Sequence, residues 1–260
     1  SSSSSYGGGP KHIYDQLRSK NKNIKSFIAC PNEKPFWSKF SVLVNQRILQ
    51  IPKRKFEFGA AIKLLFFIRV NKIQIIHSHG KGASVYARFV KIFLRLPIVH
   101  TPHGIHLYKD SQIKNFLYLL YEKIFGNLNN KIIYVSKTES NNAKNLNIYS
   151  KIDSCIILNG TENIYKKKCN KIRNELKISK NKLIITMFAR FHYQKNIIEF
   201  AKIAGLFSDV NFWLLGDGDE RNNITGYCKQ NKINNIWMPG NIENTTEILL
   251  NSDIYLSTAR

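Results

Sequence analysis

Two cationic side chains in the C-terminal half of the chain have the type and spacing that suit a phosphate group. Arg190 and Lys195 belong to the segment ARFHYQK, which follows a short apolar run and precedes a helical pattern. Arginine offers a planar fork of donors to phosphate oxygens, and lysine offers a compact charge. Because 40 of the 260 residues are Lys or Arg, their spacing alone carries no weight. The interpretation that they bind phosphate depends instead on their place beside a helix N-terminus, which favours anions.

The segments around this loop predict a strand, a helix and a second strand. Residues 183–187 form a short apolar run that suits a buried strand, residues 197–204 have a broad apolar stripe, and residues 211–215 form another buried run that ends at GDG. Such a unit places its two strands parallel in one sheet, whose ligands bind at the carboxyl ends of the strands. The sequence therefore predicts a phosphate site at that edge.

The rest of the chain alternates between short apolar runs and amphipathic segments, which predicts further α/β structure. Strands are expected at 25–29, within 37–51, and at 73–77, 97–100, 131–135, 155–158, 235–238 and 253–256. Helices are expected at 12–20, 57–70, 84–94, 112–125, 137–146, 219–231 and 243–250. Ser136 and Glu139 form a capping-box pattern, and the Lys- and Asn-rich segment 161–171 predicts a linker.

The formal net charge of +23 favours anionic partners, but the lysines are spread along the whole chain. Docking to an anionic membrane surface and a merely solvated basic surface both remain open. The charge alone motivates nucleic-acid binding, and because clustered basic and aromatic motifs are missing we expect no specific nucleic acid. Neither a signal peptide nor an apolar run long enough for a spanning helix is found, and the cysteines (Cys30, Cys155, Cys169 and Cys228) are widely spaced. We therefore expect a cytoplasmic protein with free thiols, peripheral at most on the cytoplasmic face of the membrane.

Several segments, taken in order, resemble a known family. The segments HSHGKGASVYARF, HTPHGIHLY, YVSKTESNNAKN, ILNGTE, ARFHYQKN and LLGDGDER resemble retaining GT-B glycosyltransferases of family 4, the "group 1" class. The resemblance implies an α/β fold with two doubly wound Rossmann-like domains that face a cleft. Residues 1–160 would form the acceptor-side domain and residues 161–260 the nucleotide-sugar domain. Compared with the family pattern, most of the first strand and a Glu-x7-Glu segment are missing, so we expect a chain truncated at both ends with an incomplete second domain.

The resemblance also implies site residues. Catalytic roles fall on His103, Arg190 and Lys195, with His103 in the segment TPHG facing the donor sugar; the alternative is that His103 only caps a turn beside Gly104. The implied donor-binding residues are Gly8, Gly9, Arg190, Lys195, Gly216, Asp217, Met238, Pro239 and Gly240. His79 and His106 are implied on the acceptor side. Pro10 and Lys11 depart from the family's glycine-rich turn, so a disordered leader remains an alternative for that segment.

Two patterns that could bind a metal are interpreted otherwise. Asp217-Gly218-Asp219 is a D-x-D sequence, but its glycines and the following helical pattern favour backbone contacts to phosphate or sugar. His77 and His79 have no carboxylate or third histidine near them in the sequence. We therefore expect no metal and no cofactor, because the nucleotide sugar is a substrate.

The resemblance implies a hexosyltransferase that moves a sugar from a nucleoside-diphosphate donor, a UDP-sugar, to a glycan or lipid-linked acceptor with retention at the anomeric carbon. The implied setting is the synthesis of cell-surface polysaccharide, such as capsule or lipopolysaccharide. Fixed cations would stabilise the charge that develops on the departing diphosphate. The alternative is a catalytically inactive fragment that binds a nucleotide sugar or a partner subunit.

Overall fold

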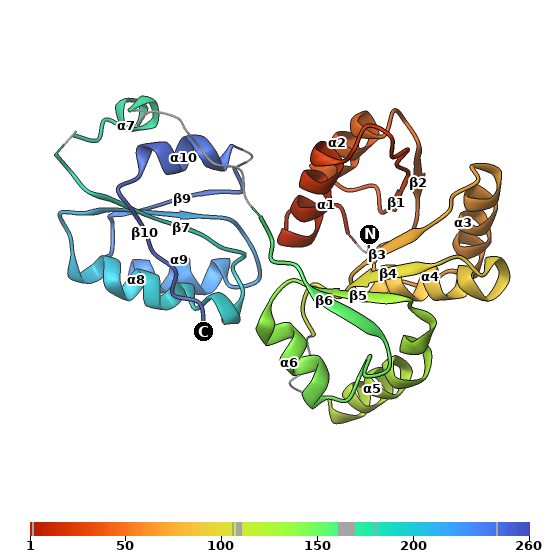
Figure 1. Cartoon of the computed structure of the whole chain (residues 1–260). Helices are drawn as coiled ribbons and strands as arrows, with labels where there is room; N and C mark the ends of the chain where they lie inside the picture. The colour runs from red at the N-terminus through yellow and green to blue at the C-terminus, as the bar shows by residue number, and fades with distance from the viewer. Residues whose placement is uncertain (2, 106, 108–110, 161–169, 180, 243) are drawn as a thin grey trace. The chain divides into compact units, whose positions relative to one another are not determined.

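The computed structural model divides the chain into two compact units, residues 1–161 and residues 162–260. The residues that it describes are 1, 3–105, 107, 111–160, 170–179, 181–242 and 244–260 (Figure 1). Both units are built from parallel strands that alternate with helices. The predicted α/β class is therefore confirmed for each unit.

Unit 1 contains two parallel sheets that are not hydrogen-bonded to each other in the described residues. One pairs β1 (Ile28–Cys30) with β2 (Ile48–Gln50), and the other has the order β3 (Ile76–His79), β4 (Ile98–Thr101), β5 (Lys131–Tyr134) and β6 (Asp153–Ile156). The helices are α1 (Gly8–Ser19), α2 (Phe36–Leu43), α3 (Phe58–Val70), α4 (Lys81–Leu94), α5 (Gln112–Phe125) and α6 (Lys137–Asn145), with a 3-10 turn, η1, at Gly126–Leu128. A cavity of about 420 Å³ is lined by residues of β1, β3, α1, α3 and α4.

The segment 37–51 differs from its prediction. The strand expected within it is confirmed as β2, but most of the helix α2, which was not expected, also lies in this segment. Phe36, Phe40 and Val44 follow one another at helical spacing, and all three are buried in the core with Ile13 and Ile28. The apolar run at the start of this segment therefore has a helical period, which its many β-branched and aromatic residues obscured.

Unit 2 has one four-stranded parallel sheet in the order β10 (Ile254–Tyr255), β7 (Ile184–Phe188), β8 (Asn211–Leu215) and β9 (Ile236–Gly240). The other elements are α7 (Lys171–Glu175), the 3-10 turn η2 (Tyr193–Lys195), α8 (Ile197–Leu206), α9 (Arg221–Gln230) and α10 (Thr245–Asn251). Figure 1 shows α8 and α9 along one face of the sheet and α7 and α10 along the other. Helices on both faces make this sheet doubly wound, which confirms the prediction for 183–215.

The core of unit 2 explains why these segments fold as they do. Met187 from β7, Phe200 from α8, Phe212 from β8 and Ile224 from α9 are fully buried in one cluster. On the other face, Trp213 packs with residues of α7 and α10. Successive residues of β8 thus point to opposite faces and both faces are covered, as an uninterrupted apolar strand requires. This core fixes the strand ends that carry the candidate site, while most of the expected linker, 161–169, lies outside the described residues.

Candidate functional site

The ends of three neighbouring strands in unit 2 are tied together by backbone hydrogen bonds. Beyond β7, the N–H of Ala189 donates to the carbonyl of Leu215 over 2.9 Å, and that of Phe191 donates to Asp217 over 2.9 Å. The N–H of Gly216 donates to Gly240 at the end of β9, also over 2.9 Å. The structure therefore brings the loops that carry Arg190, Gly216, Asp217 and Gly240 to one carboxyl edge of the sheet.

Two glycines allow these loops to approach each other. Gly216 has a φ of 124°, and a Cβ built on it would lie 1.8 Å from the carbonyl oxygen of Ala189. Gly218 has a φ of 156°, and its Cβ would lie 2.4 Å from the carbonyl oxygen of Phe191. No side chain fits at either distance, so the loop after β8 can lie against the loop after β7 only with glycine in both places.

The Arg190 side chain is 61% exposed beside this edge, and its Nη2 atom lies 4.0 Å from the Oδ2 atom of Asp219. An ion pair that is exposed on both sides contributes little to stability, so an incoming anion can replace the carboxylate at small cost. The guanidinium therefore lies where its donor fork can bind phosphate oxygens.

Lys195 ends the η2 turn, two residues before α8 begins at Ile197. Its side chain is exposed, and its backbone carbonyl accepts a hydrogen bond of 3.2 Å from the Thr258 hydroxyl. The intervening Asn196 adopts a left-handed conformation with a φ of 49°, which turns the chain into the helix. A cavity of about 270 Å³ adjoins this turn and is lined by His192, Asn196 and Arg260, among others. Lys195 therefore lies at a helix N-terminus, as predicted.

Arg221 is a third cation at this edge, and the sequence reasoning did not assign it a role. Its Nη2 donates to the carbonyl of Met238 over 3.1 Å, and its Nη1 lies 3.7 Å from the Oδ1 atom of Asp217. The side chain thus links the loop after β8 to β9, which includes the exposed Pro239. Arg221 is the last residue of the motif LLGDGDER, and this position was the sequence feature that could have indicated its role.

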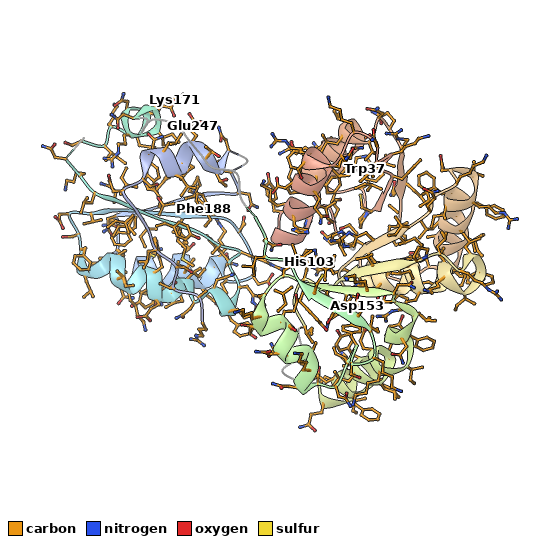
Figure 2. The ribbon with its side chains drawn as sticks, viewed as in Figure 1. Trp37, His103, Asp153, Lys171, Phe188 and Glu247 are labelled. Carbon is orange, nitrogen blue, oxygen red and sulfur yellow. The ribbon has the colours of Figure 1, made fainter. Side chains whose placement is uncertain are left out.

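In unit 1, three histidines from different elements meet. His79 ends β3, His103 lies in the loop that follows β4 (Figure 2), and His12 lies in the second turn of α1. The Nδ1 atom of His79 and the Nε2 atom of His103 are 2.9 Å apart, which is hydrogen-bond distance. One ring nitrogen of each of the three lies within 4.8 Å of the other two. The expectation that no third histidine lies near His79 is therefore wrong, because the contact comes from tertiary packing.

Backbone geometry and a buried carboxylate hold the His103 loop. His103 has a left-handed φ of 57°. The N–H of the next residue, Gly104, donates to the carboxylate of Glu139 in α6. The other oxygen of this carboxylate accepts a 2.8 Å bond from Val135 N–H, while Ser136 accepts one from Glu139 N–H over 3.0 Å. The bond from Glu139 N–H to Ser136 is thus the half of the predicted capping box that is present. The Glu139 carboxylate instead accepts hydrogen bonds from Val135 and from Gly104 in the His103 loop.

Burial keeps the three imidazoles neutral near pH 7. Burial, followed by the nearby His12, lowers the pKa of His103 to about 4. Burial lowers the pKa of His12 as well, and that of His79 falls well below its usual value because of burial and the adjacent His77. His103 can therefore accept or donate one hydrogen bond as a neutral ring, but it does not supply a positive charge.

The remaining predicted residues are placed less specifically. Gly8 and Gly9 form the first turn of α1, which begins earlier than expected; a Cβ on Gly9 would lie 3.8 Å from the His103 ring, and one on Gly8 would meet nothing within 4 Å. Ser4, which precedes this helix, is fully buried in the unit. His106 lies outside the described residues. His103 belongs to unit 1 and the Arg190–Lys195 loop to unit 2, so each set is defined by the contacts of its own unit.

Parallel α/β units with candidate residues at the carboxyl ends of their strands are typical of enzymes with Rossmann-like domains. Solved glycosyltransferase structures superpose on the chain, and the fold is therefore the GT-B fold. The chain belongs to glycosyltransferase family 4, whose family model matches residues 6–162. No curated protein matches the sequence.

Three solved structures illustrate the similarity of fold. HepE of Anabaena, solved with UDP and glucose, superposes with a TM-score of 0.76 at 16% identity, covering 97% of this chain and 71% of that one. Sucrose-phosphate synthase of Thermosynechococcus elongatus gives 0.76 at 13% identity, covering 97% and 70%. The lipopolysaccharide outer core galactosyltransferase WaaB gives 0.62 at 14%, covering 98% and 71%. At these identities the likeness supports the fold alone.

Proposed function

We propose that this protein transfers a hexose from a UDP-sugar to a glycan or lipid-linked acceptor, with retention at the anomeric carbon, in the synthesis of a cell-surface polysaccharide. Membership of glycosyltransferase family 4 supports the reaction class. HepE has been solved with UDP-glucose, and WaaB is named for a lipopolysaccharide core, which support the proposed donor and setting. Transfer by this route requires no metal or other cofactor.

The observation that carries the proposal is the joined carboxyl edge of unit 2. The exposed guanidinium of Arg190, the glycine loop that begins at Gly216, and the helix start beside Lys195 lie around one sheet edge. Cations and backbone N–H groups at a helix start suit a diphosphate. In this proposal Gly240, Met238 and Pro239 contact the nucleoside.

Departure of the diphosphate leaves negative charge on its oxygens, and fixed cations stabilise that charge more in the transition state than in the ground state. Arg190 and Lys195 are proposed to supply them. His103 is neutral at pH 7, since burial lowers its pKa to about 4, so its proposed role is a hydrogen bond to the donor sugar. Gly8 and Gly9 are proposed to contact the donor, and His79 and His106 the acceptor.

The proposal is tested with Lys195→Ala and a matched control, Lys229→Ala, in the 260-residue chain. Both lysines are exposed, but Lys229 lies in the last turn of α9. Release of UDP from a set of UDP-hexoses, with lipid-linked acceptors, measures turnover, and calorimetry measures UDP affinity. We expect Lys195→Ala to lower turnover by about 10²-fold, as for loss of a transition-state donor, and Lys229→Ala to have no effect. Equal activity of both variants would remove Lys195 from the site, and UDP binding without transfer would favour the inactive, binding-only alternative.

We further propose that the protein docks on an anionic membrane surface and transfers the sugar to its acceptor there. The helix α5 exposes Ile113, Phe116, Leu117 and Ile124, and the chain carries a net charge of +23. An apolar helix face on a basic protein suits the boundary of an anionic bilayer. None of the helices in the described part of the chain is long and apolar enough to cross a membrane. Sedimentation with vesicles containing anionic lipid tests this location, and failure to co-sediment at low salt would rule it out.

A further inference from the structure

We propose that His12, His79 and His103 form a binding site for a divalent transition-metal ion, zinc above all. Each contributes one ring nitrogen, and these three atoms lie within 4.8 Å of one another. They come from α1, the end of β3 and the loop after β4, so only the folded unit 1 assembles them.

The geometry is close to that of a metal-bound set. A tetrahedral zinc ion holds its nitrogen ligands at about 2.0–2.1 Å, which separates neighbouring nitrogens by roughly 3.4 Å. His79 Nδ1 and His103 Nε2 are 2.9 Å apart, so they must part by roughly 0.5 Å, and His12 must approach by up to roughly 1.4 Å. Small side-chain rotations supply such movements.

The surroundings hold the ligands in place. His79 is only 6% exposed, and its ring packs on that of His77 at a centroid distance of 4.0 Å. His77 is in turn 2.9 Å from the Thr101 hydroxyl, two residues before His103. The next residue, Gly104, is bound by the Glu139 carboxylate. These contacts limit the movement of the His79 ring and of the loop that carries His103.

The type of ligand selects the metal. Three imidazole nitrogens suit zinc, copper and nickel, whereas magnesium and calcium prefer oxygen ligands. Three protein ligands leave a fourth position for water or for an oxygen of a bound molecule. His79 lines the cavity of about 420 Å³ in unit 1, which provides open space beside the cluster.

One consequence rests on the proposed function. We place the proposed hydrogen bond from His103 to the donor sugar on its Nε2 atom, the nitrogen that faces His79, and a nitrogen that ligates zinc cannot also bind a hydroxyl group. Zinc at this site would therefore inhibit transfer, although the transfer itself needs no metal. A substitution of His12 can separate inhibition by zinc from catalysis, because His12 has no proposed role in the reaction.

The site is tested by titrating the metal-free 260-residue chain with zinc chloride in a calorimeter and with cobalt chloride in a spectrophotometer. We expect one zinc ion per chain and the visible absorption of four-coordinate cobalt without thiolate charge-transfer bands. Magnesium chloride should not compete. His12→Ala should weaken zinc binding by at least tenfold, while His192→Ala, a histidine of unit 2, should leave it unchanged. Circular dichroism of each variant confirms that it is folded.

Three results would overturn the site: no zinc binding by the wild-type chain, equal affinity in His12→Ala, or equal loss in His192→Ala. Transfer assays then address inhibition separately. Zinc should inhibit the wild type, and His12→Ala should require at least tenfold more zinc for the same inhibition. Zinc that binds without inhibiting would refute the consequence for His103 but leave the site intact, and UDP calorimetry shows independently whether the proposed donor site exists.

Discussion

Replacement of Gly216 by alanine tests how the candidate donor edge is built. The residue has a φ of 124°, and a Cβ there would lie 1.8 Å from the carbonyl oxygen of Ala189, where non-bonded atoms need more than 3 Å. The loop after β8 must therefore move away from the loop after β7. Such a movement breaks the 2.9 Å bond from Gly216 N–H to Gly240 or the equally short bond from Ala189 N–H to Leu215.

The expected cost follows from two contributions. A non-glycine residue held in this backbone region costs about 1–3 kcal/mol. Loss of one or two of the backbone hydrogen bonds costs about 1 kcal/mol each. The reduced freedom of the unfolded chain offsets about 0.4–1 kcal/mol. We therefore expect Gly216→Ala to lower the free energy of unfolding of unit 2 by about 3 kcal/mol.

Urea unfolding followed by tryptophan fluorescence measures this loss. Trp213 and Trp237 pack together in unit 2, so a Trp37→Phe background makes the signal specific to that unit. With a slope of about 1.5 kcal/mol per molar urea, a loss of about 3 kcal/mol lowers the midpoint by about 2 M. Affinity for UDP, measured by calorimetry, should fall with it.

Gly226→Ala is the matched control. Gly226 lies within α9, and a Cβ there would meet nothing within 4 Å. Alanine is the better helix former by about 1 kcal/mol, so this variant should be slightly more stable than the wild type. A midpoint for Gly216→Ala within about 0.3 M of the wild type, equivalent to roughly 0.5 kcal/mol, would refute the close approach of the two loops.

Two other predictions concern unit 1. Burial lowers the pKa of His100 to about 3, so between pH 6.5 and 3 the unfolded chain binds the extra proton, and stability should fall as pH falls, by about 1.4 kcal/mol per unit. Urea midpoints at pH 7 and pH 5 should therefore differ less for His100→Gln than for the wild type; an equal difference would contradict the assignment. Glu139→Gln leaves one acceptor for the N–H groups of Gly104 and Val135, which should cost about 1–3 kcal/mol and speed amide hydrogen exchange at Gly104. Unchanged exchange there would show that the carboxylate does not hold the loop.

Local patterns predicted most of the elements because each pattern arises within one element. The helix expected at 112–125 has those bounds in the structure, and so does the strand expected at 211–215. Within 37–51 the strand β2 was predicted, but the helix α2 was missed because a helical stripe of aromatic and branched side chains also matches a buried strand. Only packing against Ile13 and Ile28 distinguishes the two.

The histidine cluster is a contact between separate elements, which local sequence patterns cannot predict. The resemblance implied a donor-side role for His103 and an acceptor-side role for His79, and these two residues lie at or just beyond the carboxyl ends of β4 and β3. His12 belongs to a helix, and its contact with both depends on how α1 packs against the sheets. The contact therefore has no local sequence signature, and the reasoning that excluded a metal considered only neighbours along the chain.

The glycines of the motif GDGD were interpreted as residues that let a phosphate approach the backbone. The structure shows a role that does not depend on a ligand. Gly216 and Gly218 allow the carbonyl groups of Ala189 and Phe191 to approach to distances that no side chain permits. They determine where the loop carrying Arg190 lies, whether or not a ligand is bound. Their contribution to donor binding in the proposed function is thus largely one of positioning Arg190. For this reason a substitution there should lower stability and affinity together, whereas Lys195→Ala should lower turnover and leave stability unchanged.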